Sequence, residues 1–345
     1  MSKESNLLGY PERINNLLKP RKGGPIVVDL FAGCGGLSLG FEATGFTVVG
    51  YEADKTCCRT YQRNLNGPCH HLYLTDDTPL CPATILVGGP PCQPFSVIGL
   101  QKGVSDVRNG LPLFINAVQT LNPDIWIFEN VRGLMYRSKW YLDKVVAELR
   151  SLGYIVELQL LNAVNFGVPQ NRERLIVVGH RGRFSYPEKN VYTVTVAEAI
   201  GDTIETTPPE SKFLTQSMDN YIARYEAKSC CINPRDLRLH QPARTLTCRN
   251  LAGATSDMQR VRLPDGRRRR LLVAEAKRLQ SFPDWFEFHG TEQEQFNQIG
   301  NAVAPFFAYQ LASSVADYIN SSLRYNTDEI AELNQVLQQG VLSYE

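Results

Sequence analysis

The feature that most restricts the fold of this chain is an alternation of short β-rich segments with helical segments over roughly its first half. Strand and helix in alternation are typical of a parallel sheet whose two faces are covered by helices. The β-rich segments stand at 26–31, 47–51, 84–88, 124–129, 154–161 and 175–179, and the helical segments at 37–44, 55–65, 113–121 and 140–152. We therefore predict an α/β fold built on a mostly parallel sheet.

The sequence changes character after about residue 180. Proline, threonine, arginine and polar residues dominate without a clean period as far as about residue 268. We expect a smaller, irregular domain at 181–295 and a larger one made of 1–180 plus 296–345. Helical patterns return at 273–280 and 296–320, where Ala302 to Ala304 are expected on an apolar face, and a last amphipathic helix follows.

Composition places the chain in the soluble globular class. It is 43% hydrophobic and 21% charged, and no apolar stretch is long enough to cross a membrane. The first residues contain no apolar signal core, so we expect a cytoplasmic protein, and a monomer. Nine cysteines with no Cys-x-x-Cys pair predict reduced thiols. Cys69-His70-His71 lacks a second pair at zinc-finger spacing, so no metal is expected.

The net charge of +1 conceals a basic segment. Residues 230–280 contain 12 Lys plus Arg against 4 Asp plus Glu, a surplus of +8, which leaves −7 for the rest of the chain. Such asymmetry is consistent with a polyanionic partner and equally with a solvated charged face.

A glycine-rich turn follows the first predicted strand and opens a helix. It runs Phe31-Ala32-Gly33-Cys34-Gly35-Gly36. Glu52 ends the next strand, 19 residues after Gly33, where an acidic side chain commonly binds a ribose diol. The glycine pattern is incomplete for a dinucleotide, and a purely structural turn is the alternative. We expect an adenosine-containing ligand.

Cys92 follows the strand at 84–88 and is preceded by Pro90 and Pro91. This position lies at the carboxyl edge of the sheet, where ligand crevices form in open parallel sheets. Free cysteines are usually small buried residues, but two prolines hold the backbone stiff, which helps a nucleophile more than a packing residue. The residues alone leave both interpretations open.

Charged residues end two further strands at the same edge. Glu129 closes the strand 124–129 and is expected to point into the same crevice as Cys92. The segment 170–174 precedes the last strand of the sheet and adds guanidinium groups there. An exposed glutamate and a surface Arg-Glu pair are the alternatives.

Five sequence blocks, in this order, resemble those of the cytosine-5 DNA methyltransferases. They are Asp29 to Gly36, Gly89 to Ser96, Glu129 to Val131, Gln170 to Arg174, and Gly300 to Val303. The resemblance spans about residues 26 to 313. It implies a Rossmann-like S-adenosylmethionine-dependent methyltransferase domain with a smaller, irregular target recognition domain, and duplex DNA with a short specific site as substrate.

The resemblance also implies a covalent mechanism. Cys92 would attack carbon 6 of a cytosine flipped out of the duplex, and Glu129 would bind ring nitrogen 3 and the exocyclic amine. Carbon 5 would then take the methyl group of S-adenosylmethionine, and loss of its proton would expel the thiolate. Arg174 would contact the cytosine carbonyl, and Arg172 would support the pocket of the nucleophile.

Carried over by position, the resemblance gives two further sets of residues. Cofactor contacts are expected at Phe31, Ala32, Gly33, Cys34, Gly35, Gly36, Glu52, Asp76, Pro91 and Asn301. DNA contacts are expected at Ser96 and Arg108 of a mobile loop, and at Arg244, Thr245 and Arg249 of the recognition domain. Four consecutive arginines, 267–270, are interpreted as phosphate contacts rather than a solvated hairpin end.

Three alternatives stay open beside this interpretation. A tRNA methyltransferase of the same family would typically contain Cys-Phe-Thr where this chain has Thr247-Cys248-Arg249. A catalytically silent DNA-binding relative would have no use for Cys92, Glu129 and Arg174 together. A nicotinamide-dependent oxidoreductase would leave the Pro-Pro-Cys sequence without a purpose. The absence of a long extension fits a restriction-modification system, in which a cognate endonuclease acts separately.

Overall fold

The computed structural model describes residues 8–91, 109–228, 230, 235–252, 257–321 and 324–341. The chain divides into two compact units. The unit that we call the sheet unit contains Pro20–Asn162, Glu173–Glu188 and Ala308–Glu345. The helical unit contains Met1–Lys19, Ala163–Arg172 and Lys189–Phe307. The functional domain boundaries predicted above stay a prediction.

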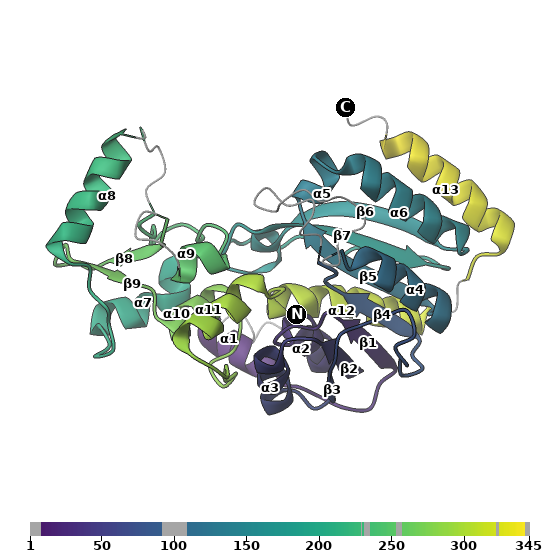
Figure 1. Cartoon of the computed structure of the whole chain (residues 1–345), viewed down its shortest axis with the longest axis horizontal. Coiled ribbons are helices and arrows are strands. Elements are labelled where there is room, and N and C mark those ends of the chain that lie inside the picture. Colours follow the sequence, from purple (N-terminus) through teal and green to yellow (C-terminus); the bar gives the residue numbers. More distant parts are fainter. Residues whose placement is uncertain are drawn as a thin grey trace. The chain divides into compact units, whose positions relative to one another are not determined.

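A seven-stranded sheet forms the centre of the sheet unit (Figure 1). Its strands are β1 (Ile26–Leu30), β2 (Thr47–Glu52), β3 (Cys69–His71), β4 (Ile85–Gly88), β5 (Ile125–Val131), β6 (Ile155–Asn162) and β7 (Glu173–His180), in the order β3-β2-β1-β4-β5-β7-β6. β7 runs antiparallel to both of its neighbours, and every other pairing is parallel. The predicted mostly parallel α/β fold is confirmed.

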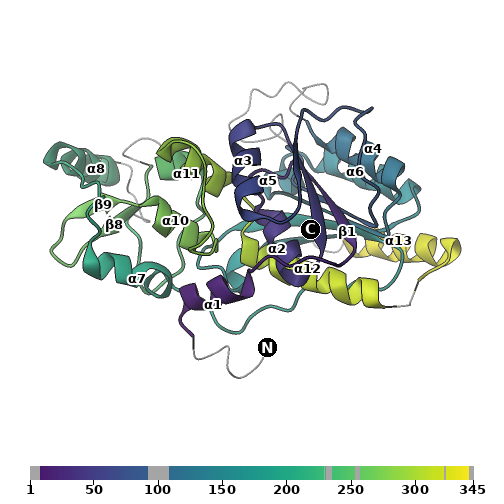
Figure 2. The same ribbon diagram turned by 90° about the horizontal axis from the view of Figure 1, so that it is seen from below.

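Helices cover both faces of this sheet. One face is packed by α4 (Leu111–Leu121), α5 (Gly133–Tyr136) and α6 (Lys139–Ser151). The other face carries α2 (Gly36–Thr44) and α3 (Lys55–Asn64), and Figure 2 shows α12 (Pro305–Asn320) beside α2. The two helices approach closely, since a Cβ added to Gly40 would collide with Ala308. α13 (Thr327–Val341) contacts β6.

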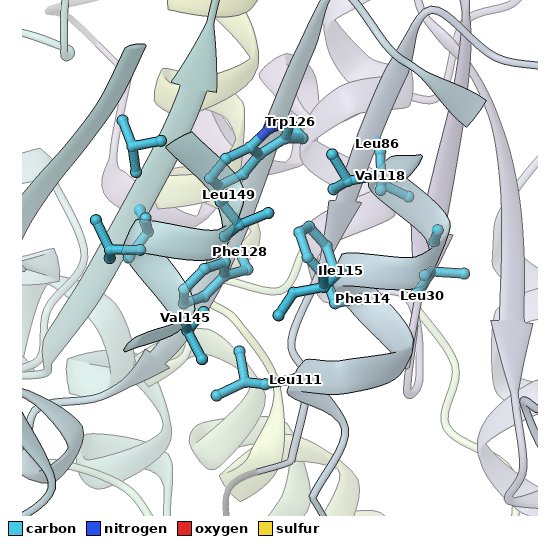
Figure 3. Close-up of a cluster of buried hydrophobic side chains, with 14 of the residues drawn as sticks. Leu30, Leu86, Leu111, Phe114, Ile115, Val118, Trp126, Phe128, Val145 and Leu149 are labelled. Carbon is cyan, nitrogen blue, oxygen red and sulfur yellow. The ribbon is translucent and has the colours of Figure 1, made fainter. Parts of the chain in front are cut away.

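The core lies between the sheet and α4 and α6 (Figure 3). Trp126 and Phe128 point from β5 toward Phe114 of α4, and all three side chains are fully buried. Their rings meet edge to face at centroid distances of 6.0 and 5.5 Å, a favourable arrangement for aromatic pairs. This packing holds β5 rigidly, which matters because β5 ends at the candidate site.

The helical unit is built from short elements. These are α1 (Tyr10–Leu17), the 3-10 turn η3 (Ala163–Phe166), α7 (Val196–Thr206), α8 (Gln216–Lys228), α9 (Cys248–Ala252), β8 (Arg260–Arg262), β9 (Arg268–Arg270), α10 (Val273–Leu279) and α11 (Glu292–Asn301). α7 begins with a capping box in which Thr195 and Glu198 satisfy each other's backbone N–H groups. None of the described helices is long and apolar enough to span a membrane.

One predicted helix is wrong in its extent. The expected helix at 296–320 is interrupted, since α11 ends at Asn301 and α12 begins at Pro305. Ala302 has extended backbone angles (φ −64°, ψ 147°), and proline disfavours helical conformation at the residue before it. Residues 302–304 therefore form a connection rather than a helical face.

Candidate active site

The glycine-rich turn after β1 has the backbone geometry that its glycines permit. Gly33 and Gly35 have φ of +56° and +91°, in the left-handed region that favours glycine. Phe31 has φ of +60°, which is strained for a residue with a side chain. A Cβ added to Gly33 would meet nothing within 4 Å, so the turn is open for a ligand to approach its backbone.

Glu52 holds this turn in place from the end of β2. Its Oε2 accepts a hydrogen bond from the Gly33 backbone N–H at 2.7 Å, and its Oε1 accepts one from Asp54 N–H at 2.7 Å. The structure thus brings the predicted ribose-binding carboxylate directly to the glycine turn, as the spacing of 19 residues indicated. Each oxygen retains a lone pair that can accept from a hydroxyl group.

A small pocket is lined in part by Leu30, at the end of β1. Asp76, Leu80 and Asn116 are among the residues that line it, and Asn116 Nδ2 donates to the Asp76 carbonyl oxygen at 2.8 Å. The open glycine turn and the Glu52 carboxylate fit an adenosine-containing cofactor.

Two residues of the turn would contact a cofactor by backbone only. Cys34 is 3% exposed, and burial raises the pKa of its thiol to about 12, which keeps it protonated. Ala32 is also buried. The Phe31 ring, by contrast, is half-buried, and it lies beside Gly110, where an added Cβ would stand 2.8 Å from Phe31 Cζ.

The segment after β4 is pinned to its neighbours at the carboxyl edge of the sheet. Asn130 Nδ2 donates to the Pro90 carbonyl oxygen at 3.0 Å, and Gly110 N–H donates to the Pro91 carbonyl oxygen at 2.8 Å. Two prolines and two long-range hydrogen bonds fix the approach to position 92. Asn130 belongs to the sequence block Glu129 to Val131 but was not predicted as a site residue. Its position directly after Glu129 could have indicated such a role.

Glu129 and Arg174 form an ion pair at this edge. Arg174 Nε lies 2.7 Å from Glu129 Oε1, and the two side chains are 15% and 14% exposed. Because Val131 pairs with Arg174 across the antiparallel β5–β7 ladder, Glu129 stands diagonal to Arg174 on the same face. A Cβ added to Gly89 would lie 3.9 Å from Glu129 Oε2. The carboxylate therefore faces the segment that leads to Cys92.

Cys92 itself lies outside the described residues, as do the predicted loop contacts Ser96 and Arg108. Their roles stay predictions.

Comparison with known proteins gives the family. The model of the C-5 cytosine-specific DNA methylase family matches residues 26–317. The chain belongs to this family. The predicted enzyme class, DNA (cytosine-5-)-methyltransferase, is confirmed, and the alternative of a nicotinamide-dependent oxidoreductase is wrong.

Relatives in the C-5 cytosine-specific DNA methylase family match nearly the whole chain. Type II methyltransferase M.AplI of Arthrospira platensis is 53% identical over 340 residues, which cover 97% of this chain and 99% of the relative. Type II methyltransferase M.XorII of Xanthomonas oryzae pv. oryzae is 31% identical and covers 92% and 90%. Among solved structures, the Entamoeba histolytica methyltransferase EhMeth shares the fold, with a TM-score of 0.67 at 15% identity over 87% of this chain and 100% of that one.

Arg172 is placed in the helical unit, where it binds three backbone carbonyl oxygens. Its guanidinium donates to Leu246 O at 2.8 Å, to Gly300 O at 3.1 Å and to Ala302 O at 2.9 Å. Only 2% of the residue is exposed. One side chain thus joins the segment after Arg244 to the end of α11. Its predicted role at the pocket of the nucleophile stays a prediction.

Gln170 and Gln280 belong to the same buried network and were missed by sequence reasoning. Gln170 Nε2 donates to Gln280 Oε1 at 2.5 Å, and Gln170 Oε1 accepts from Leu246 N–H at 2.8 Å. Gln280 Nε2 donates to Ala302 O at 2.6 Å. Gln170 opens the Gln-Asn-Arg-Glu-Arg block, but Gln280 stands in a helical stretch with no signal of its own.

The predicted recognition residues lie near each other around α9. Thr245 Oγ1 donates to Asn171 O at 2.6 Å, and Arg249 forms an ion pair with Asp257 at 2.8 Å while 69% exposed. Arg244 is exposed. The exposed Asn301 ends α11, and its Oδ1 accepts from the Cys248 thiol at 3.0 Å. Contact of these residues with DNA or cofactor stays a prediction.

The interpretation of the four consecutive arginines is wrong for two of them. Arg269 has no exposed side-chain surface and donates to both carboxylate oxygens of Glu275, at 2.7 and 2.6 Å. Arg268 is 17% exposed and binds Asp219 at 3.0 Å and Asp236 at 2.9 Å. A buried, doubly paired guanidinium cannot reach a phosphate without breaking these bonds.

The same ion pairing accounts for much of the basic segment at 230–280. Arg260 is fully buried between Glu226 at 2.9 Å and Asp236 at 2.8 Å, and Asp236 also binds Arg262 at 3.2 Å. These arginines hold the helical unit together. Arg244 and Arg249 differ from them in being exposed, although Arg249 also pairs with Asp257.

Proposed function

We propose that this chain is the modification enzyme of a type II restriction-modification system, and that it methylates carbon 5 of one cytosine in a short specific sequence of duplex DNA. Family membership gives the reaction class, and the names of M.AplI and M.XorII support the biological setting. The observation that carries the proposal is the Glu129–Arg174 ion pair, which faces the stiff segment preceding Cys92.

The catalytic roles follow from the chemistry of an unactivated aromatic carbon. Cytosine carbon 5 is too weak a nucleophile at neutral pH, so the Cys92 thiolate first adds to carbon 6 and makes carbon 5 electron-rich. Glu129 holds ring nitrogen 3 and the exocyclic amine, and Arg174 contacts the ring carbonyl. After methyl transfer, loss of the carbon 5 proton re-forms the double bond and expels the thiolate, leaving 5-methylcytosine. The cytosine is flipped out of the stack, since neither carbon is accessible within it.

The sheet unit would hold the cofactor. S-adenosylmethionine, when bound, supplies the methyl group and leaves as S-adenosylhomocysteine. Glu52 would accept hydrogen bonds from the ribose hydroxyls, and the backbone of the glycine turn would lie against the amino-acid part. Asp76 would stand at the nucleobase, in the pocket beside Leu30. Phe31, Pro91 and Asn301 complete the proposed set.

The helical unit would read the DNA sequence through Arg244, Thr245 and Arg249. Ser96 and Arg108 would contact phosphates beside the flipped base. We further propose that the enzyme acts as a cytoplasmic monomer, and that a cognate endonuclease acts separately.

The reaction is tested by trapping the covalent step. DNA from cells expressing the protein is sequenced for 5-methylcytosine, and a duplex with the mapped site is made with 5-fluorocytosine at the target position. The fluorine blocks elimination, so a stable adduct through Cys92 is expected by mass spectrometry, and Cys92→Ala should form none. An adduct on another cysteine, or methylation of tRNA but not of DNA, would overturn the proposal.

A further inference from the structure

We propose that a patch at residues 131–140 contacts the DNA that flanks the target cytosine. This inference rests on the proposed function and adds a second contact surface, in the sheet unit, to the recognition residues of the helical unit. The patch consists of the exposed side chains of Val131, Arg132, Tyr136, Arg137, Lys139 and Trp140.

The patch is continuous with the candidate active site. β5 carries Glu129 and ends at Val131, two residues or about 7 Å farther along the strand. Arg132 Nη1 donates to Glu173 Oε2 at 2.7 Å, and Glu173 directly precedes Arg174 in β7. The same pair of strands therefore presents first the Glu129–Arg174 ion pair and then the patch.

The exposure of large apolar side chains here is not a failure of packing. Tyr141 and Leu142 are 3% and 2% exposed in the core beneath α6, whereas the neighbouring Trp140 is 59% exposed. Tyr136 of α5 is 60% exposed, and Val131 is 39% exposed. The helices thus bury one set of side chains and leave an aromatic pair four residues apart on the outside. Clustered exposed apolar groups mark interaction surfaces.

Positive charge accompanies the aromatic rings. The ten residues 131–140 contain three cations and no acid. The Arg132 guanidinium lies over the Tyr136 ring at 5.1 Å, so a charge and an aromatic ring stand side by side in the patch. Lys139 lies 3.9 Å from Asp143, with both side chains at least half exposed, and such a surface pair is weak enough to exchange for a phosphate.

Substrate DNA is the occupant that these observations favour. A cytosine held by Glu129 remains attached to its own backbone, so the neighbouring phosphates must pass the protein surface closest to the end of β5. Aromatic rings interleaved with Arg and Lys match sugar, base and phosphate together. An apolar dimer contact would be served poorly by three cations, since a two-fold interface would bring like charges together.

The test measures binding and covalent trapping separately. Affinity of the S-adenosylhomocysteine-saturated protein for a duplex with the mapped site is measured at several salt concentrations. Tyr136→Ala and Trp140→Ala are each expected to weaken binding about fivefold or more, the effect of one lost stacking contact. Arg137→Gln should lower the slope of log K against log salt by about 0.9, the value for one phosphate contact.

Matched controls come from the helical unit. Tyr192 is 60% exposed, the same as Tyr136, and Lys189 is an exposed cation outside every proposed site, so Tyr192→Ala and Lys189→Gln should leave affinity and slope unchanged. All variants at saturating DNA should still form the 5-fluorocytosine adduct. If the wild type forms no adduct, the proposed function fails.

Suppose that the wild type forms the adduct but the patch variants bind DNA as tightly as the wild type. This result would overturn the inference about the patch and leave the proposed function standing. Analytical ultracentrifugation tests whether the patch instead binds a second copy of this chain. A wild-type dimer that Trp140→Ala converts to a monomer, with DNA affinity retained, would make the patch a self-association surface and likewise overturn the inference.

Discussion

At the scale of single residues, the Glu129–Arg174 pair combines an observed structural role with the catalytic role that we propose for it. Both side chains are mostly buried, so each charge depends on the other for stabilisation. Removing either partner leaves an uncompensated charge and also removes one of the two proposed contacts to the cytosine ring.

Arg174→Met is expected to lower methyl transfer about 100-fold or more and to destabilise the fold by roughly 1–3 kcal/mol, the effect of leaving a buried polar group without its partner. The double variant with Glu129→Gln should regain part of the stability but none of the activity. Denaturant unfolding and initial rates measure the two effects. Equal stability of the single and double variants would contradict the coupling.

A second residue-scale prediction concerns Asp29, which is buried beneath the glycine turn. Desolvation raises its pKa from 3.8 to about 7, partly opposed by the Ser38 hydroxyl, which donates at 2.5 Å, while the charge of Glu52 raises the pKa further. The folded state therefore binds a proton that the unfolded state has lost. Stability from this group is full below pH 4 and declines as pH rises to about 7.

Asp29→Asn should remove this decline, since its side chain does not titrate. The difference in unfolding free energy between wild type and variant is expected to change by on the order of 4 kcal/mol between pH 4 and 8, and denaturant titrations across that range would measure it. A constant difference over the same range would show that Asp29 titrates normally.

At the scale of elements, the contact between α9 and α11 depends on one glycine. A Cβ added to Gly300 would collide with the backbone nitrogen of Cys248 and lie 2.7 Å from the backbone carbon of Thr247. Backbone atoms cannot move aside as a flexible side chain can, so the two elements must separate.

Gly300→Ala is therefore expected to destabilise the protein by about 1–3 kcal/mol, the usual effect of overpacking. Gly201→Ala in α7 is the matched control, because a Cβ there meets nothing within 4 Å, and it should stabilise by about 0.5–1 kcal/mol through helix propensity. Thermal unfolding compares the two variants. The same sign for both would contradict the steric argument.

Prediction from sequence succeeded where pattern and packing agree. β1, β4 and β5 are buried along most of their length, so their continuous apolar runs were readable, whereas β3, with two of its three residues exposed, was not predicted. The antiparallel direction of β7 could not be predicted from the sequence, because it depends on how β7 pairs with β5 rather than on the residues of β7. Glu129 and Arg174 were expected at one edge, since both stand at strand ends. The buried amides of Gln170 and Gln280 meet across about 110 residues, and no local pattern predicts that.

At the scale of the whole molecule, the chain passes between its units more than once. The helical unit combines residues 1–19, 163–172 and 189–307, and its formal charge is +4 against −3 for the sheet unit. α1 is tied to distant residues, since Asn15 Oδ1 accepts from Asp284 N–H at 2.6 Å and Trp285 Nε1 donates to Asn15 O at 3.4 Å. Such long-range assembly favours slow folding.

A chain that lacks residues 1–19 should lose on the order of 5 kcal/mol of stability, because Tyr10, Ile14 and Leu18 are almost fully buried. A chain that begins at Leu8 keeps all three and should be more stable than the chain that lacks residues 1–19 by this amount. Denaturant unfolding of both chains tests this. Equal stability of the two shortened chains would show that α1 is dispensable.

The arginines of the helical unit are of two kinds, buried and exposed, and this difference is useful for engineering. Arg260 is buried and paired with Glu226 and Asp236, and Arg269 is buried and paired with Glu275. Arg244 and Arg249 are exposed instead, and the ion pair of Arg249 with Asp257 lies at the surface. If the proposed DNA contacts are right, a library that randomises Arg244 and Arg249 and keeps Arg260 and Arg269 fixed should change sequence preference while each variant retains the same scaffold.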